Sequence, residues 1–332
     1  MTKTYLFASA LLALLAFIGA SGTSQAAPRL KVVAYVPNWN EAAGLAKTID
    51  YAKITHLNIA FENPINDAGD LSFQAGDAAL IAAAHAHHVP VLLSIRGGGV
   101  PDNKVLMARY QLLLSGEKRA GFVAKMAAFL TAHKFDGLDV DLEGPAIGPD
   151  YGAFVHDLAL TLKPSGKLLT AALSQGYGGD SVVASVFADL DWVNIMAYDA
   201  TGPWNPDKPG PHSSLAFAKS STAYWLGRGL PKSKAVLGLP FYGYGFGPAF
   251  RAGGYTYAEI VAAHPGAENA DEVGQTIYYN GLPTIRAKTQ YARAEGLAGV
   301  MVWSVDQDAA GDRSLLSAID GALRANPGPP AR

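Results

Sequence analysis

The stretch FDGLDVDLEGP at residues 135–145 constrains the fold of this chain more than any other stretch. It is dense in acidic residues, although Asp, Glu, Lys and Arg together make up only 16% of the chain. In a β-strand, side chains two positions apart point the same way, so Asp139, Asp141 and Glu143 would share one face. Three carboxylates directed into a protein interior are unfavourable unless they are paired or protonated. The stretch therefore predicts a central strand whose acids serve a function.

Short apolar segments alternate with helical patterns along the rest of the chain. Besides the acidic strand, seven segments predict strands, at 30–39, 54–63, 90–99, 167–175, 191–199, 235–243 and 299–307. Eight strands alternating with helices indicate an α/β fold, a (β/α)8 TIM barrel, and an open doubly wound sheet is the alternative. Residues 245–282, between strand seven and its helix, predict a short insertion with a hairpin that turns at Asn280-Gly281.

Both ends of the chain predict segments outside the barrel. Residues 1–26 have the pattern of a signal peptide, in which Lys3 precedes an apolar run too short to span a membrane. We expect cleavage after Ala26 or Ala27, and an uncleaved anchor is the alternative. Residues 27–325 then form a single (β/α)8 domain, and residues 326–332 form a disordered tail.

Composition excludes several functional classes. The chain has no cysteine, which excludes disulfides, thiolate catalysis and cysteine metal sites. Its net charge of −2 argues against nucleic acid as a partner. His85 and His88 share a helical face and have no carboxylate partner nearby in sequence, so we expect a solvated helix end and no metal site there. Export without disulfides is typical of a bacterial secreted or periplasmic protein with a large core. We expect the protein to be a monomer and, after signal cleavage, not to be attached to a membrane.

In a (β/α)8 barrel, functional side chains lie at the carboxyl ends of the strands. That places Glu143 at the rim, Asp141 one layer down and Asp139 deeper. Neighbouring like charges raise the pKa of at least one acid, which keeps a general acid protonated near neutral pH. Aromatic rings around acids suit a sugar, whose C–H faces pack on them. The ends of the other predicted strands carry Tyr35, Trp39, Phe61, Met196, Tyr198, Asp199, Tyr242 and Trp303.

These residues resemble glycoside hydrolase family 18, the chitinase-like group. The family motif D-G-x-D-x-D-x-E is matched from Asp136 to Glu143, and its motif M-x-Y-D is matched from Met196 to Asp199. Trp303 corresponds to the tryptophan of the family's eighth strand. The resemblance extends from about residue 31 to about residue 323, over nearly the whole chain beyond the signal peptide.

The resemblance implies a retaining hydrolysis of β-1,4 linkages next to N-acetylglucosamine, in chitin or chitooligosaccharides, without metal or cofactor. The substrate's own 2-acetamido oxygen would attack the anomeric carbon. Glu143 would protonate the glycosidic oxygen, Asp141 would stabilise the acetamido group, and Asp139 would share a proton with Asp141. Tyr198 would hydrogen-bond the acetamido oxygen. The substrate-binding residues implied by the resemblance are Tyr35, Phe61, Met196, Asp199, Tyr242 and Trp303.

Two positions depart from the family pattern. The third strand usually ends S-x-G-G, whereas here Arg96 precedes the glycines and either alters a donor-side subsite or is a solvated arginine on a loop. Tyr244 stands where the family often has an arginine. The departures leave open an endo-β-N-acetylglucosaminidase that acts on peptidoglycan or on the N-glycan core. A non-catalytic chitin-binding lectin is a further alternative, although such lectins typically lose the glutamate that Glu143 supplies.

Overall fold

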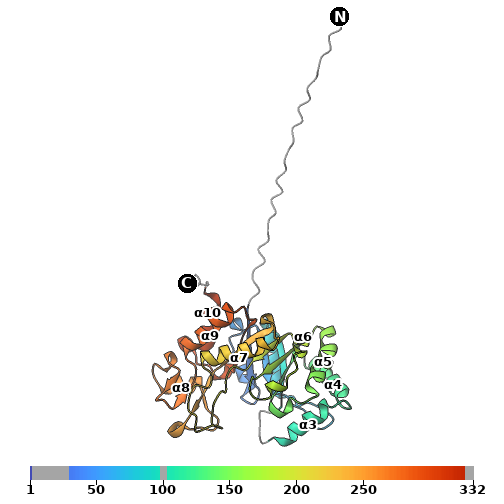
Figure 1. Cartoon of the computed structure of the whole chain (residues 1–332), viewed down its shortest axis with the longest axis horizontal. Coiled ribbons are helices and arrows are strands. Elements are labelled where there is room, and N and C mark those ends of the chain that lie inside the picture. The colour runs from blue at the N-terminus through green and yellow to red at the C-terminus, as the bar shows by residue number, and fades with distance from the viewer. Residues whose placement is uncertain (2–29, 98–102, 326–332) are drawn as a thin grey trace.

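The computed structural model describes residue 1 and residues 30–97 and 103–325. Within these ranges, eight parallel strands close into a barrel in the order β1-β12-β7-β6-β5-β4-β3-β2 (Figure 1). The predicted (β/α)8 barrel is confirmed, and the alternative of an open sheet is wrong. The barrel strands are β1 (Lys31–Pro37), β2 (His56–Ala60), β3 (Val91–Gly97), β4 (Gly137–Leu142), β5 (Leu168–Leu173), β6 (Trp192–Ile195), β7 (Ala235–Pro240) and β12 (Gly299–Trp303).

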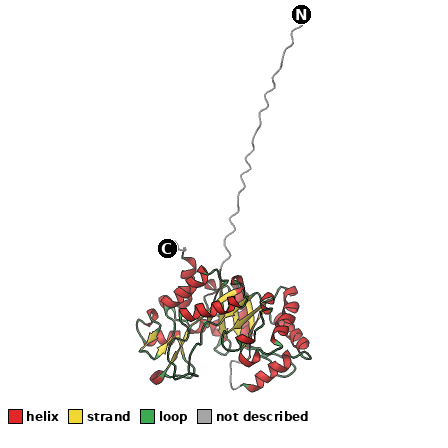
Figure 2. Ribbon diagram, in the orientation of Figure 1, coloured by secondary structure: helices red, strands yellow, loops and turns green. Residues whose placement is uncertain are grey.

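Helices surround the barrel, as Figure 2 shows in red around the yellow strands. Sequence reasoning did not anticipate α3, which begins after Asn103; the Oδ1 atom of this residue accepts a hydrogen bond from the Leu106 amide at 2.9 Å. The helices are α1 (Ala42–Leu45), α2 (Ala75–Ala86), α3 (Lys104–Leu114), α4 (Arg119–Ala132), α5 (Tyr151–Leu162), α6 (Val186–Asp189), α7 (Leu215–Gly227), α8 (Tyr257–Ala263), α9 (Leu282–Ala294) and α10 (Leu315–Arg324).

Two apolar layers explain the alternation in the acidic strand. Leu138, Val140 and Leu142 belong to the large core between the strands and the surrounding helices. A smaller apolar cluster fills the barrel itself and includes Leu92 and Met301. Because successive strand residues point to opposite faces, the acids of β4 face this inner space. The predicted two-residue alternation therefore describes the strand correctly.

The insertion lies between β7 and α9 and begins at Tyr242, slightly earlier than predicted. Its helix α8 lies on one flank of the molecule, opposite α3 and α4 (Figure 1). Tyr242 therefore starts the inserted sheet and does not end the seventh barrel strand, because β7 stops at Pro240. The insertion forms an antiparallel sheet in the order β10-β11-β8-β9, with β8 (Tyr242–Gly245), β9 (Tyr255–Thr256), β10 (Glu272–Val273) and β11 (Ile277–Tyr278).

The prediction of a hairpin that turns at Asn280-Gly281 is wrong. The hairpin in the structure joins β10 to β11, with Val273 paired to Ile277. Gly281 instead provides the N-cap of α9, and Asn280 is buried. The Asn-Gly pair favours a turn locally, but here it marks the entry to a helix.

Several other sequence expectations concern the periphery. The predicted signal peptide at 1–26 and tail at 326–332 lie outside the described residues, apart from residue 1. Among the residues described, no helix is long and apolar enough to cross a membrane. The described part of the chain also holds no group of three or more His, Cys, Asp or Glu that could bind a metal ion. His85 Nε2 lies 2.8 Å from Asp136 Oδ2, at the amino end of β4 and away from the strand's other acids.

Candidate active site

The acidic strand β4 delivers its three inward carboxylates at successive depths. Asp139 is fully buried and Asp141 is 4% exposed. Glu143 follows the last residue of β4 and is partly exposed at the rim. The rim carboxyl can thus reach a ligand in the barrel mouth, whereas the two aspartates support it from below.

Asp139 accepts hydrogen bonds from four side chains on four other strands. Tyr35 and Ser94 donate hydroxyl hydrogens to its Oδ2 atom at 2.6 and 2.8 Å. Thr170 and Asn194 donate to its Oδ1 atom at 2.5 and 3.2 Å. Burial raises the pKa of Asp139, while these four donors oppose that rise by stabilising the carboxylate. The four hydrogen bonds hold Asp139 in place and join β1, β3, β5 and β6 through it.

Asp141 has the opposite surroundings. Its Oδ1 atom is buried and has no hydrogen-bond partner among the described residues. Burial raises the pKa of Asp141 well above its ordinary value, and the charges of Glu143 and Asp139 raise it further. Of the two buried aspartates, Asp139 and Asp141, Asp141 is therefore the one that favours the proton.

Glu143 has the protonation behaviour of a general acid. Burial is the main cause that raises its pKa to about 7, and the charge of Asp199 adds to the rise. The charge of Arg96 acts in the opposite direction on this pKa. A carboxyl with a pKa near neutral is protonated in a large fraction of molecules at neutral pH and can return to the anion during a reaction.

A row of aromatic rings covers one side of the mouth. Trp303 at the end of β12 stacks on Phe61 with ring centroids 5.6 Å apart, and it also contacts Tyr35 at 5.4 Å. Phe61 stacks in turn on Trp39 at 6.0 Å. Trp39 is 56% exposed and extends the row outward. The sequence placed it at a strand end, but not among the substrate-binding residues implied by the family resemblance. The row offers successive apolar faces on which pyranose rings could pack.

The opposite side is built from the exit of β6 and the inserted strand β8. Asp199 Oδ1 accepts hydrogen bonds from the phenols of Tyr242 at 2.5 Å and Tyr244 at 3.1 Å. Tyr244, the departure from the family pattern, is thus a second phenol on the same carboxylate. The Tyr198 hydroxyl lies 3.8 Å from the sulfur of Met301 inside the barrel.

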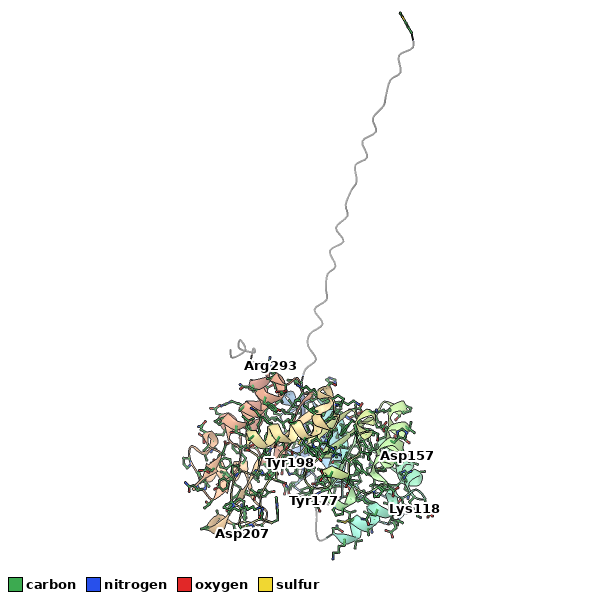
Figure 3. All side chains as sticks on the ribbon, viewed as in Figure 1. Lys118, Asp157, Tyr177, Tyr198, Asp207 and Arg293 are labelled. Atoms are coloured by element: carbon green, nitrogen blue, oxygen red, sulfur yellow. The ribbon has the colours of Figure 1, made fainter. Side chains whose placement is uncertain are left out.

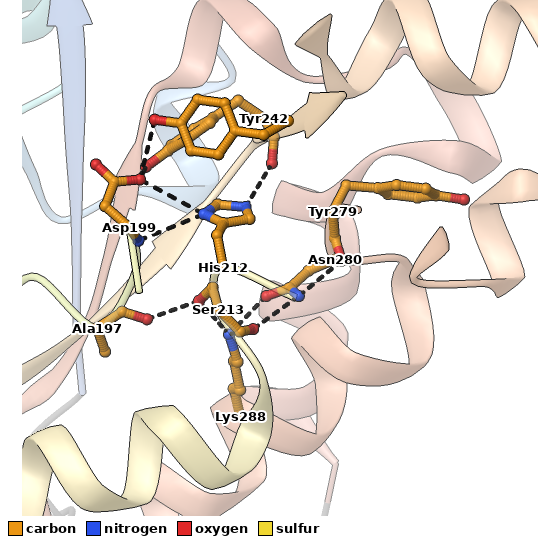
Figure 4. A network of polar contacts seen from close by, with 9 residues as sticks. Ala197, Asp199, His212, Ser213, Tyr242, Tyr279, Asn280 and Lys288 are labelled. Carbon is orange, nitrogen blue, oxygen red and sulfur yellow. Dashed lines mark hydrogen bonds and ion pairs between the residues drawn. The ribbon is translucent and has the colours of Figure 1, made fainter. Parts of the chain in front are cut away.

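A buried network holds this side in place (Figure 4). His212 Nε2 lies 3.3 Å from the Tyr242 carbonyl, which can only accept, so Nε2 carries the hydrogen. His212 Nδ1 then accepts from the Asp199 amide at 3.4 Å. The Ser213 hydroxyl donates to the Ala197 carbonyl at 2.6 Å. The contacts of His212 with Asp199 and of Ser213 with Ala197 tie the exit of β6 to the loop before α7.

Lys288 of α9 supports the same loop from behind (Figure 4). Its fully buried Nζ atom contacts the Ser213 carbonyl at 2.6 Å, the Ser213 hydroxyl at 2.7 Å and Asn280 Oδ1 at 2.6 Å. Three acceptors match the three donors of an ammonium group. Burial lowers the pKa of Lys288 to about 7. Lys288 and Asn280 therefore link the insertion, α9 and the loop that follows β6.

The predicted site residues gather in one cavity, with a single exception. Asp139 lies beneath the cavity and acts through its neighbours, whereas Arg96 and Tyr244 join the lining. Beyond Glu143 the cavity continues past Tyr177 and Trp204, and Tyr198 lines both parts of it. Figure 3 labels Tyr177 and Tyr198 among the side chains. The predicted residues that line the cavity are Tyr35, Phe61, Asp141, Glu143, Met196, Tyr198, Asp199, Tyr242 and Trp303.

Sequence reasoning missed the donors that surround Asp139. Ser94, Thr170 and Asn194 lie in VLLSIRG, LLTAAL and WVNI, which are otherwise mostly apolar strand segments. A single polar residue in the middle of a buried strand needs a hydrogen-bond partner. That pattern could have pointed to these three positions, although it could not have paired them with Asp139.

A (β/α)8 barrel whose rim presents a carboxyl of raised pKa among aromatic rings is an arrangement suited to a glycoside hydrolase. The model of glycosyl hydrolases family 18 matches residues 31–308 of this chain. The chain belongs to this family and is a glycoside hydrolase.

Several proteins that are named chitinases are similar to this chain in structure or in sequence. The structure resembles the GH18 chitinase ChiB from the chitin utilization locus of Flavobacterium johnsoniae, with a TM-score of 0.82 and 37% identity over 89% of this chain and 94% of that one. Class V chitinase CHIT5 of Lotus japonicus is 29% identical over 83% of this chain and 82% of its own length. Probable chitinase 10 of Drosophila melanogaster is 27% identical over 92% of this chain, which spans only 16% of that protein.

Proposed function

We propose that this chain hydrolyses β-1,4 linkages next to N-acetylglucosamine in chitin or chitooligosaccharides, with retention of the anomeric configuration. The observation that carries the proposal is the contrast along β4. Glu143 stands at the rim with a pKa of about 7, directly above Asp141, whose buried Oδ1 atom has no partner among the described residues. A neutral Asp141 can turn toward Glu143 or toward a substrate N–H without leaving a buried charge unpaired.

In the proposed reaction, Glu143 protonates the glycosidic oxygen as the bond to the leaving sugar breaks. The acetamido oxygen of the substrate forms the new bond to the anomeric carbon and gives an oxazolinium ion. Asp141 stabilises this ion through the acetamido N–H, and Tyr198 orients the acetamido oxygen. Glu143 then removes a proton from water, which attacks the same carbon and restores the acetamido group. General acid–base assistance of this kind contributes about 10²–10⁴-fold.

Substrate binding is proposed to use both walls of the cavity. The sugar at the bond to be cleaved lies on Trp303, with Tyr35 and Phe61 beside it. Asp199, already held by two phenols, accepts a hydrogen bond from a sugar hydroxyl. The relatives named chitinases support a chitin-type substrate, and the aromatic row suits a chain of several pyranose rings.

The test is product analysis on three substrates in parallel: chitin oligosaccharides, an N-glycoprotein and peptidoglycan. We expect cleavage of the chitin oligosaccharides, with the new reducing ends released first as the β-anomer by proton NMR. An initial α-anomer would exclude participation of the acetamido group. The Glu143→Gln variant serves as the matched control, because it preserves shape and removes the acid.

The other outcomes separate the remaining functions. Cleavage of peptidoglycan or N-glycoprotein, with chitin oligosaccharides untouched, would assign an endo-β-N-acetylglucosaminidase. A wild-type protein that is inert on all three substrates and still binds chitin oligosaccharides tightly would be a lectin. Retention of Glu143 and its raised pKa argues for the hydrolase.

We also propose that the protein is exported and is either secreted from the bacterial cell or located in the periplasm. Residues 1–26 carry the signal-peptide pattern of a charged start, an apolar run and small residues at the cleavage site. N-terminal sequencing of the protein from a bacterial host should find a mature chain that starts at residue 27 or 28. An intact residue 1 in the exported fraction would contradict cleavage.

A further inference from the structure

Arg96 is part of the barrel wall beside the acidic strand. It belongs to β3 and pairs in register with Asp141 of β4, just as Ser94 pairs with Asp139. Because Ser94 bonds Asp139 inside the barrel, Arg96 two residues further on faces the same inner side. Of the two alternatives for Arg96, the solvated arginine on a loop is therefore wrong.

The surroundings of Arg96 direct it into the cavity. Its guanidinium lies 5.3 Å from the centre of the Phe61 ring, and its backbone N–H donates to Asn63 Oδ1 at 3.1 Å. The Tyr110 hydroxyl donates to the same Oδ1 atom at 2.7 Å, which steadies this strand end. Arg96 and Glu143 line both the inner part of the cavity and its extension toward Trp204. The arginine thus shares its space with the carboxyl proposed as the acid.

The cavity is otherwise acidic or neutral. Asp141 faces Glu143 from β4, and Asp199 faces it from the exit of β6. Among the described residues that line the cavity and its extension, Arg96 is the one with a cationic side chain. Phenols complete the group of titratable neighbours, namely Tyr35, Tyr198, Tyr242 and Tyr244 from the inner cavity and Tyr177 from its extension.

We propose that Arg96 is a positioning residue that stabilises the anionic form of Glu143 after proton transfer, and thereby determines the alkaline limit of activity. The inference rests on the proposed function only in taking Glu143 as the acid. Proton donation leaves a carboxylate in a site that already holds Asp199. A cation nearby lowers the free energy of that carboxylate and makes Glu143 a stronger acid.

The pKa directions agree with this geometry. Burial and Asp199 raise the pKa of Glu143, while Arg96 lowers it. Arg96 also opposes the rise in the pKa of Asp141 that burial and the two neighbouring acids cause. Loss of the arginine charge should therefore move the pKa of Glu143 upward from about 7.

Two variants separate charge from packing. Arg96→Met keeps an apolar stem against Phe61 and removes the charge, whereas Arg96→Lys keeps the charge and loses the planar group. We would measure kcat/KM against pH with a soluble chitin oligosaccharide. The fall of kcat/KM on the alkaline side, the alkaline limb of the profile, should move to higher pH by roughly one unit in Arg96→Met. It should stay at the wild-type pH in Arg96→Lys.

The control is Lys219→Met. Lys219 is exposed on α7 with its Nζ 5.6 Å from the ring of Tyr291, so the variant removes a comparable cation from a ring outside the cavity. Its alkaline limb should match the wild type. Thermal unfolding of all variants checks that each chain is folded.

A second readout does not depend on turnover. Carbon-13 NMR titration of glutamate-labelled protein, with Glu143→Gln to assign the resonance, reports the pKa of Glu143 directly. An equal pKa of Glu143 in wild type and Arg96→Met, with only KM raised, would overturn the inference. Arg96 would then contribute only its packing against Phe61. An equal upward shift in Arg96→Lys and Arg96→Met would also overturn it. Failure of the proposed function would instead appear as a wild-type protein without activity.

Discussion

The two layers of acid on β4 differ in how completely their polar atoms are bonded. The lower layer, Asp139, accepts four hydrogen bonds from four strands. Burial raises the pKa of all three acids, but the upper layer, Asp141 and Glu143, has a buried oxygen without a partner in the described part of the chain. A fully bonded carboxylate resists movement and proton exchange, whereas a sparsely bonded one can do both. We therefore expect the lower layer to support the site and the upper layer to react.

The largest expected effect comes from the rim. Glu143→Gln removes the proton donor and keeps the side-chain shape, so kcat should fall by about 10²–10⁴-fold. Affinity for chitin oligosaccharides, measured by calorimetry, should stay near the wild-type value. Glu259→Gln, which alters an exposed glutamate on α8, should keep full activity. Near-normal turnover in Glu143→Gln would remove Glu143 from the role of acid.

Asp141→Asn should have the second largest effect. Asparagine resembles the protonated acid of the resting site, but it cannot give up a proton and become the anion that would stabilise the oxazolinium ion. The value of kcat should therefore fall by about 10²–10³-fold. Single-turnover kinetics on a chitin oligosaccharide would place this loss in the chemical step. An unchanged single-turnover rate would contradict a reactive upper layer.

The same variant should be more stable than the wild type at neutral pH. The pKa of Asp141 is raised in the folded protein, so its contribution to stability is greatest below the ordinary value of about 4 and is lost as pH rises toward the folded value. Asparagine does not titrate and avoids this loss. The difference in Tm between Asp141→Asn and wild type should therefore grow from pH 4 to pH 7.

The pH dependence of the wild type should follow the upper layer. Glu143 is active as an acid when protonated, so kcat/KM should fall about tenfold per pH unit above its pKa of about 7. Initial rates at low substrate concentration between pH 4 and pH 9 would measure this limb. A rate that stays flat up to pH 9 would show that another step limits kcat/KM.

The inward-facing acids of the upper layer and the barrel could be predicted from the sequence, because both follow from patterns that repeat within a few residues. Alternation in FDGLDVDLEGP predicted which side chains face inward, and the β4 core contacts confirm it. Eight strand segments interrupted by helices were enough to predict the closed barrel. The predicted strand at 90–99 contained Arg96, but local patterns left open whether this arginine lines a subsite or is solvated on a loop.

The lower layer could not be read from local patterns. The hydrogen bond from Tyr35 to Asp139 joins residues 104 positions apart in the chain, so the pairing exists only in the folded barrel. Lys288 resembles an ordinary helix lysine in sequence, yet it is fully buried against Ser213 and Asn280. The demand of that buried ammonium for acceptors explains why Asn280 lies inside the protein and not in an exposed turn.

The smallest expected effect on activity comes from the lower layer. Thr170→Val is nearly isosteric and removes the 2.5 Å hydrogen bond to Asp139. Because the acceptor is a buried carboxylate, the free energy of unfolding should fall by about 1.5–3 kcal/mol. Three donors to Asp139 remain, so kcat should fall less than about tenfold. Urea unfolding and steady-state kinetics measure the two effects.

The matched control for this variant is Thr289→Val in α9. Thr289 is equally buried, but its hydroxyl donates to the Ile285 carbonyl at 2.8 Å, an uncharged acceptor. Its loss of stability should be smaller, about 1 kcal/mol, because a hydrogen bond to a neutral group contributes less. If Thr170→Val lowered kcat as far as Asp141→Asn, the two layers would not differ in role. Asp139 would then take part in the chemistry, because a group that only supports the site tolerates the loss of one donor among four.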